Sequence, residues 1–230
     1  MILAIDSSSL VASVAIADEE NIVAEYTVNL KKTHSQTLLP MIQEIFEMTG
    51  LSQKELQAIA VTEGPGSFTG LRIGAATAKG LALALNIPMV GISTLRVMAN
   101  NYNHCNKLVC PIMDARRNQV YTGIYDCSEE EPVTIFEDCA ITIEALMKEL
   151  TTINREVIFV GDGIPAFREV LDSELMVKHY YAKHNFNRQQ ASSLAALAAV
   201  MVEKNEVISS DAFAPKYFRL SQAERERMQG

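Results

Sequence analysis

The chain contains no tryptophan, and its four cysteines form no Cys-x-x-Cys pair. They stand at positions 105, 110, 127 and 139, without histidines at zinc-finger spacing. This pattern favours reduced thiols over a disulfide framework or a zinc finger. His104, Cys105 and Cys110 are three conceivable metal ligands, but buried or unused side chains are the simpler interpretation.

Positive charge is also scarce, because 20 lysines and arginines stand against 28 acidic residues and give a net charge of −8. A protein that holds nucleic acid unaided needs a basic surface, so we expect a partner to hold any RNA. The N-terminus lacks the basic region of a signal peptide. The longest apolar helix, about 71–85, contains Arg72 and Lys79 and is too short to span a bilayer. We therefore expect a cytoplasmic protein with no membrane contact.

A glycine-rich loop is the most distinctive feature that is present. It reads Gly-Pro-Gly-Ser-Phe-Thr-Gly-Leu-Arg-Ile-Gly from Gly64 to Gly74, after an apolar run and before a helix rich in small residues. Such a loop permits close backbone approach and can hold an anion or a neighbouring chain. It lacks the Lys-Ser or Lys-Thr pair of a Walker A loop, and Thr69 replaces the third glycine of a dinucleotide fingerprint. Both common phosphate-binding motifs are therefore excluded.

Hydrophobic periodicity predicts a βββαβαβ order in the first part of the chain. We expect strands at 2–5, 11–17, 22–28, 58–61 and 88–92. We expect helices at about 36–49, with Gly50 as its C-cap, and at 71–85. The first three strands leave no room for a helix between them, so this order differs from that of a Rossmann domain.

A second unit follows the polar stretch 100–107, and the 230 residues are enough for two small cores. We expect its strands at 108–113, 120–125 and 157–160. We expect helices near 143–150, along the stripe 194–201, and after the capping-box match Ser221-x-x-Glu224. The predicted division is an N-terminal lobe, 1–103, and a C-terminal lobe, 104–230, that ends in a charged helix.

Several motifs, taken in order, resemble the bacterial TsaB family, also called YeaZ, of tRNA threonylcarbamoyladenosine biosynthesis. The matching strings are Ile5-Asp6-Ser7-Ser8, His34-Ser35 through Leu39-Pro40, the glycine-rich loop up to Arg72, Met113-Asp114-Ala115-Arg116-Arg117 with Val120-Tyr121, Gly161-Asp162-Gly163 and Pro215-Lys216-Tyr217-Phe218-Arg219. The glycine-rich string and the Asp-Ala-Arg-Arg string are specific, whereas Asp-Ser-Ser or Gly-Asp-Gly alone is weak.

The resemblance implies the actin-like (ASKHA, ribonuclease H-like) α/β fold, with two lobes that each hold a mixed five-stranded βββαβαβ sheet flanked by helices. It also implies a non-catalytic scaffold or activator subunit. This subunit is required for threonylcarbamoyl transfer to adenosine 37 of tRNAs that read codons beginning with A. The expected partners are TsaD in a heterodimer, the ATPase TsaE in a ternary complex, and a second copy when the chain is alone. Contact with tRNA is expected only through the complex, and no cofactor or metal is implied.

The small residues Gly70, Gly74, Ala78 and Ala82 form a flat face on the helix at 71–85. Sequence alone leaves open whether this face belongs to the core or to a docking surface. The resemblance favours docking, through this helix and the one at about 36–49. The residues so implied at the interface are Leu38, Ile42, Ile45, Gly70, Leu71, Gly74, Ala75, Ala78 and Ala82.

A second group of candidates falls where an actin-like protein has its interlobe cleft. It comprises Asp6, Ser7, Ser8, Gly66, Asp114 and Arg116. The turn 6–9 lacks the glycine of a phosphate hairpin, so a serine-capped turn is preferred over phosphate binding. Asp114, with Arg116 and Arg117, forms either an ion pair at a turn or part of a ligand cleft.

His34 is the most tempting metal ligand, because the relative TsaD holds its metal through a His-x-x-x-His pair. Leu38 stands four residues on, so a structural or interface histidine is preferred. Ser67 lacks the flanking glycines of a nucleophile elbow, and the chain has no His-Glu-x-x-His motif. The alternatives to a scaffold are an independent ASKHA-type ATP-binding enzyme and, more remotely, an M22-type glycoprotease-like peptidase.

Overall fold

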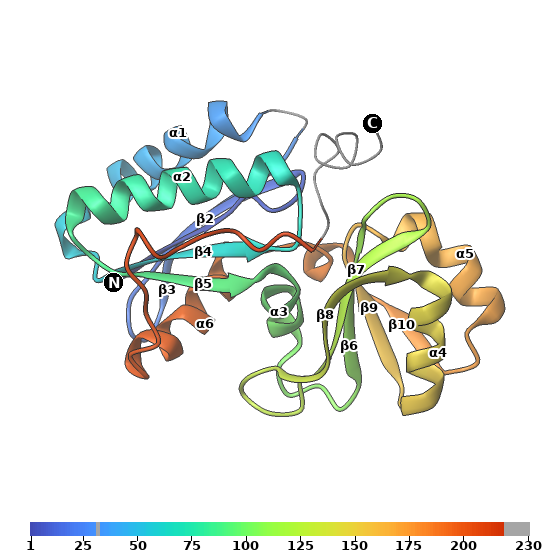
Figure 1. Ribbon diagram of the computed structural model, residues 1–230. Coiled ribbons are helices and arrows are strands. Elements are labelled where there is room, and N and C mark those ends of the chain that lie inside the picture. The colour runs from blue at the N-terminus through green and yellow to red at the C-terminus, as the bar shows by residue number, and fades with distance from the viewer. Residues whose placement is uncertain (31–32, 219–230) are drawn as a thin grey trace.

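Two five-stranded sheets form the framework of the computed structural model, which describes residues 1–30 and 33–218 (Figure 1). The first sheet has the order β3-β2-β1-β4-β5, and the second has the order β10-β9-β6-β7-β8. Each contains two antiparallel and two parallel pairings in the same arrangement. The repeated topology confirms the expected two-lobed, actin-like fold.

The first lobe follows the predicted order of elements closely. Its strands are β1 (Ile2–Asp6), β2 (Val11–Ala17), β3 (Ile22–Asn29), β4 (Ala58–Gly64) and β5 (Met89–Ser93). Its helical segments are α1 (His34–Thr49), η1 (Gln53–Glu55) and α2 (Phe68–Leu85). Gly50 ends α1 in a left-handed conformation, as expected of its C-cap.

The second lobe contains the five strands that the resemblance implies, two more than hydrophobic periodicity predicts. Its strands are β6 (Leu108–Asp114), β7 (Gln119–Asp126), β8 (Val133–Thr142), β9 (Val157–Val160) and β10 (His179–Tyr181). The helical segments that connect and follow the sheets are α3 (Thr94–Ala99), η2 (Asn100–Tyr102), α4 (Ile143–Ile153), α5 (Ile164–Glu174), η3 (His184–Phe186) and α6 (Ala191–Glu203). The helix predicted after Ser221 lies outside the described residues.

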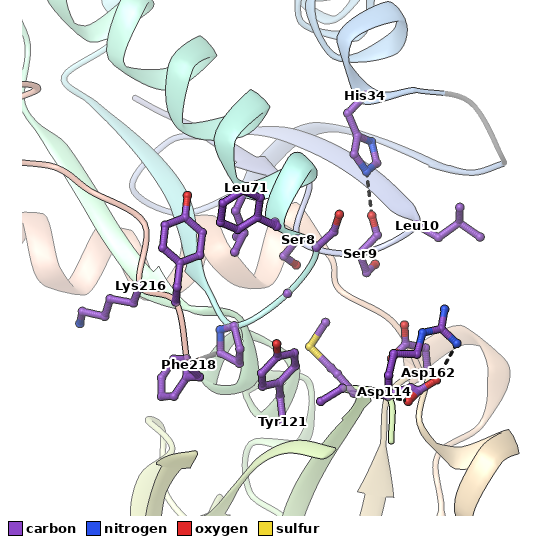
Figure 2. A pocket seen from close by; sticks show the side chains of 18 of the residues that line it. Ser8, Ser9, Leu10, His34, Leu71, Asp114, Tyr121, Asp162, Lys216 and Phe218 are labelled. Atoms are coloured by element: carbon purple, nitrogen blue, oxygen red, sulfur yellow. Dashed lines mark hydrogen bonds and ion pairs between the residues drawn. The ribbon is translucent and has the colours of Figure 1, made fainter. Parts of the chain in front are cut away.

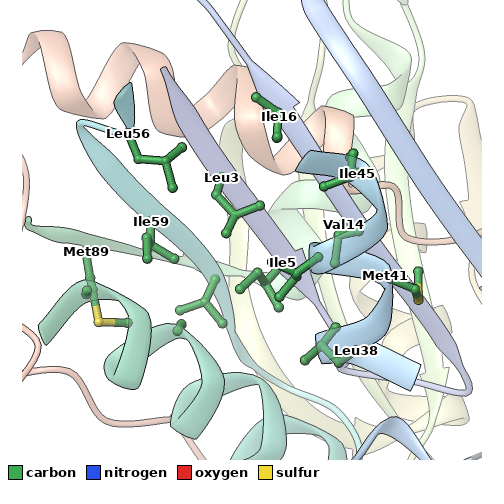
Figure 3. Close-up of a cluster of buried hydrophobic side chains, with 14 of the residues drawn as sticks. Leu3, Ile5, Val14, Ile16, Leu38, Met41, Ile45, Leu56, Ile59 and Met89 are labelled. Atoms are coloured by element: carbon green, nitrogen blue, oxygen red, sulfur yellow. The ribbon is translucent and has the colours of Figure 1, made fainter. Parts of the chain in front are cut away.

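Helices cover both faces of the first sheet. Alternate strand residues point to opposite faces, so Leu3 and Ile5 of β1 pack under α1 and α2 (Figure 3), whereas Ile2 and Ala4 pack against α6. The second sheet has a core with α4 and α5 on one face and a smaller cluster with α3 on the other. Within the described residues, no helix is both long and apolar enough to cross a membrane.

Helix α6 packs on the first sheet although it follows the whole second sheet in sequence (Figure 1). It contacts all five strands of that sheet. The chain after α6 stays on this lobe, because Ile208 pairs with Met89 and Phe213 is buried in its core. The division of the chain at 103/104 stays a prediction. Residues 191–218, which that division assigns to the C-terminal lobe, pack on the first sheet.

Candidate functional site

A cleft of about 860 Å³ opens between the two lobes (Figure 2). The lining residues come from the turn after β1, the start of α1, the glycine-rich loop with the start of α2, the end of β6 with the loop after it, β7, the turn after β9, and the C-terminal segment. Of the predicted cleft residues, Ser8, Gly66, Asp114 and Arg116 line this space. Asp6 and Ser7 are buried and do not line it.

The glycine-rich loop is packed against the turn after β1. The Ser67 amide donates to the Ser8 carbonyl at 2.6 Å, and the Ser7 hydroxyl donates to the Gly70 carbonyl at 2.9 Å. A Cβ at Gly66 would lie 2.2 Å from the Ser8 carbonyl oxygen, and one at Gly70 would lie 2.1 Å from that of Ser7. The glycines therefore permit close contact between two segments of the chain.

Asp6 fixes the same turn from inside. Its Oδ1 accepts hydrogen bonds from the Ser8 amide at 2.9 Å and from the Ser8 hydroxyl at 2.7 Å. Burial raises the pKa of the Asp6 carboxyl, and the bonds from Ser8 oppose that rise. This geometry agrees with the serine-capped turn that the sequence favours.

Asp114 and Arg116 form the ion pair at a turn that is one of the two interpretations of this cluster. Arg116 Nη1 lies 3.0 Å from Asp114 Oδ2, and the Arg116 amide donates to Asp114 Oδ1 at 2.7 Å. Arg116, Arg117 and Asn118 all have positive φ, at 65°, 57° and 59°. Three consecutive left-handed residues without glycine each cost about 1–2 kcal/mol, so the loop is held by its surroundings.

His34 makes a structural contact with the turn after β1. Its Nε2 lies 2.7 Å from the Ser9 carbonyl oxygen, which ties the start of α1 to the turn after β1 (Figure 2). Leu38, one turn further along α1, is buried in the core. Among the described residues, no group of three or more His, Cys, Asp and Glu side chains is placed to hold a metal ion.

All nine residues expected at the interface are buried inside the first lobe, so their side chains do not form an outer surface. These residues are Leu38, Ile42, Ile45, Gly70, Leu71, Gly74, Ala75, Ala78 and Ala82. The small stripe of α2 faces inward because it lets the helix approach the turn after β1. A Cβ at Gly74 would lie 2.4 Å from the Ser7 hydroxyl oxygen. In the free chain these side chains are buried, and their contact with a partner stays a prediction.

The outward sides of α1 and α2 remain available, and they are partly apolar. The exposed fractions of Leu39, Met48 and Leu83 are 56%, 74% and 69%. Gly80 faces open space, with no atom within 4 Å of the position of a Cβ. The two helices contact each other and cover the same face of the first sheet (Figure 1). Contiguous exposed apolar surface marks interaction sites, whereas single exposed apolar residues are common on protein surfaces.

The sequence analysis assigned no role to the C-terminal segment at the cleft. Lys216, Tyr217 and Phe218 line the cleft together with Phe68. The rings of Phe68 and Tyr217 lie 4.7 Å apart between centroids. The available signal was the string Pro215-Lys216-Tyr217-Phe218-Arg219 of the family resemblance, which does not give its place because the contact with Phe68 spans about 150 residues.

Two lobes of identical sheet topology with a cleft between them define the actin-like class of proteins. Comparisons with known proteins show which family within this class the chain belongs to. The family model of TsaD, tRNA N6-adenosine threonylcarbamoyltransferase, matches residues 21–227. The chain is 33% identical to the tRNA threonylcarbamoyladenosine biosynthesis protein TsaB of Bacillus subtilis, over 97% of this chain and 96% of that protein. It is 34% identical to the TsaB protein of Escherichia coli, over 74% of each.

A solved structure shares the fold of this chain. YeaZ from Pseudomonas aeruginosa matches with a TM-score of 0.77 at 24% identity, over 94% of this chain and 98% of that one. The chain belongs to the TsaB (YeaZ) family.

Proposed function

We propose that this chain is the scaffold and activator subunit of the machinery that makes threonylcarbamoyladenosine at adenosine 37 of tRNAs reading codons that begin with A. It acts in the cytoplasm by forming a heterodimer with TsaD, which carries the transfer chemistry, and the ATPase TsaE joins this pair. The observation that carries the proposal is the similarity to TsaB of Bacillus subtilis over nearly the whole of both chains.

The cleft supports a non-catalytic role. The turn after β1 and the glycine-rich loop hydrogen-bond to each other, so their backbone groups are engaged within the chain. His34 binds a backbone carbonyl and has no histidine four residues on. These features favour the scaffold over an independent ATP-binding enzyme or a metallopeptidase.

The outward sides of α1 and α2 are the proposed docking surface for TsaD, and for a second copy when the chain is alone. We call this the outer face and define it by Gln43, Glu47 and Met48 of α1 and by Arg72, Gly80 and Leu83 of α2, all exposed. Small or flat positions such as Gly80 let a partner helix approach closely. On α1 this face carries Gln43, Glu44 and Glu47 beside Met48, so its α1 side is mostly polar.

Size-exclusion chromatography with light scattering, on the chain mixed with TsaD of the same organism, tests the proposal. We expect the wild type and Gly80→Ala to elute with TsaD as a heterodimer. Gly80→Arg places a charge at the centre of the outer face and is expected to elute as a folded monomer apart from TsaD. A wild-type chain that never binds TsaD would contradict the proposed function. If the Gly80→Arg chain still binds TsaD, the interface does not include the outer face of α2.

A further inference from the structure

The chain after α6 runs back across the first lobe as a strap, which we define as residues 207–218. Ile208 and Met89 exchange backbone hydrogen bonds of 2.9 and 2.8 Å at one end. In the middle, Phe213 is 2% exposed and its carbonyl accepts from Lys79 of α2 at 3.0 Å. At the other end, the Lys216 amide donates to the Glu63 carbonyl at 2.7 Å. The strap thus lies along the flank of α2 and ends at the cleft (Figure 1).

Arg72 holds the end of the strap against the start of α2. Its guanidinium carbon lies 3.8 Å from the Phe68 ring centroid and 5.9 Å from that of Tyr217. Its Nε donates to the Tyr217 hydroxyl at 3.3 Å. We call these three residues the clamp. Tyr217 remains 42% exposed, so the core does not hold it and the clamp contacts supply much of its restraint.

The clamp joins two surfaces that are otherwise separate. Arg72, Ala76, Gly80 and Leu83 are all exposed and follow one another at helical spacing, so Arg72 belongs to the outer face of α2. Phe68 and Tyr217, which Arg72 contacts, line the mouth of the cleft. A group that binds Arg72 from outside therefore acts directly on a wall of the cleft.

We propose that the clamp couples the binding of a partner on the outer face to a change in the cleft. A carboxylate of the partner binds Arg72, which releases Tyr217 and frees the end of the strap. The proposal rests on the proposed function, because it takes TsaD as the partner. Arginine has five N–H donors, and among the described residues only Nε has a hydrogen-bond partner. A carboxylate that binds side-on accepts two parallel N–H bonds, from Nε and one Nη, and these are stronger than the single bond from Nε to the neutral Tyr217 hydroxyl that they replace. The exchange draws the guanidinium off the Phe68 and Tyr217 rings.

Hydrogen exchange on the intact chain tests the clamp without a partner. We expect Arg72→Ala to speed exchange about tenfold at the Lys216 amide, because the strap end opens more often. The Ile208 amide, at the far end, is expected to keep its rate. Tyr217→Phe keeps the ring and is expected to give a smaller increase. Arg168→Ala is the matched control, since Arg168 also lies over a tyrosine ring, at 4.4 Å from the Tyr181 centroid. Unchanged exchange at Lys216 in Arg72→Ala would overturn the clamp.

The same measurement with TsaD tests the coupling. We expect amides of α1 and α2 to become protected while the Lys216 amide exchanges faster than in the free chain. Protected helices with an unchanged or slower Lys216 amide would overturn the coupling and leave the proposed function standing. No protection anywhere on α1 and α2 would contradict the proposed docking surface and the coupling with it, whereas the Arg72→Ala result would still decide the clamp.

Discussion

At the scale of single residues, two glycines of the first lobe have opposite roles. A side chain at Gly66 would meet the Ser8 carbonyl oxygen at 2.2 Å, whereas Gly80 faces open space on α2. We predict that Gly66→Ala lowers the free energy of unfolding by about 1–3 kcal/mol, because backbone must move to make room. Gly80→Ala is expected to raise it by about 1 kcal/mol through helix propensity. Thermal unfolding of both variants checks the pair, and equal effects would show that the loop does not pack as described.

Asp6 is expected to make stability depend on pH. Burial raises its pKa in the folded chain above the unfolded value, so the protonated form favours folding. The contribution of Asp6 to the free energy of unfolding is therefore greatest below the unfolded pKa of about 3.9. This contribution is lost as the pH rises through the pKa of the folded chain. We predict that Asp6→Asn melts at or above the wild-type temperature at pH 7, and that its advantage shrinks as the pH falls towards 4. An advantage that grows on acidification would contradict this.

At the scale of elements, α2 has an inner face in the core and an outer face in solvent. Ala78 is fully buried among residues of α1 and the first sheet. We predict that Ala78→Arg unfolds the chain or costs more than about 4 kcal/mol, because the charge is buried without a partner. Circular dichroism and denaturant titration of the isolated chain measure the cost. A stable Ala78→Arg chain would place the small stripe outside the core.

The elements with strong local signals were predictable. Apolar residues alternate along the strands of the first sheet and recur at helical spacing in α1 and α2. The observed ends of these elements differ from the predicted ends by only a few residues. Hydrophobic periodicity did not locate α3, β8, α5 and β10. The long edge strand β8 pairs only with β7 and is mostly half exposed, so it lacks the apolar alternation of a buried strand. The packing of α6 on the first sheet depends on contacts across more than 170 residues, which no local period encodes.

The candidate site was predictable in outline only. The glycine-rich loop, Asp114 and Arg116 do meet at one cleft. The orientation of the small stripe was not predictable, because small side chains fit a core and an interface equally well. The position of Tyr217 was not predictable, because it depends on the path of the strap. That path is set by the burial of Phe213 and by the hydrogen bond from the Lys216 amide to the Glu63 carbonyl.

At the scale of the whole molecule, the net charge of −8 governs contact with RNA. We predict that the isolated chain binds tRNA weakly at physiological salt, because its overall charge repels phosphates beyond what Arg116 and Arg117 attract locally. A filter-binding or mobility-shift titration with and without TsaD measures the difference. Tight binding by the chain alone would contradict the expectation that the complex recruits tRNA.

Formation of threonylcarbamoyladenosine in a reconstituted mixture tests the scaffold account most directly. The mixture contains TsaD, TsaE, threonylcarbamoyl-adenylate, ATP and substrate tRNA, with this chain as wild type, as Gly80→Ala, as Gly80→Arg, or omitted. We predict full product with wild type and Gly80→Ala, and at least a tenfold loss, about 1.4 kcal/mol in the barrier, with Gly80→Arg or no chain. Product formed equally well without the chain, or by the chain in the absence of TsaD, would contradict the account.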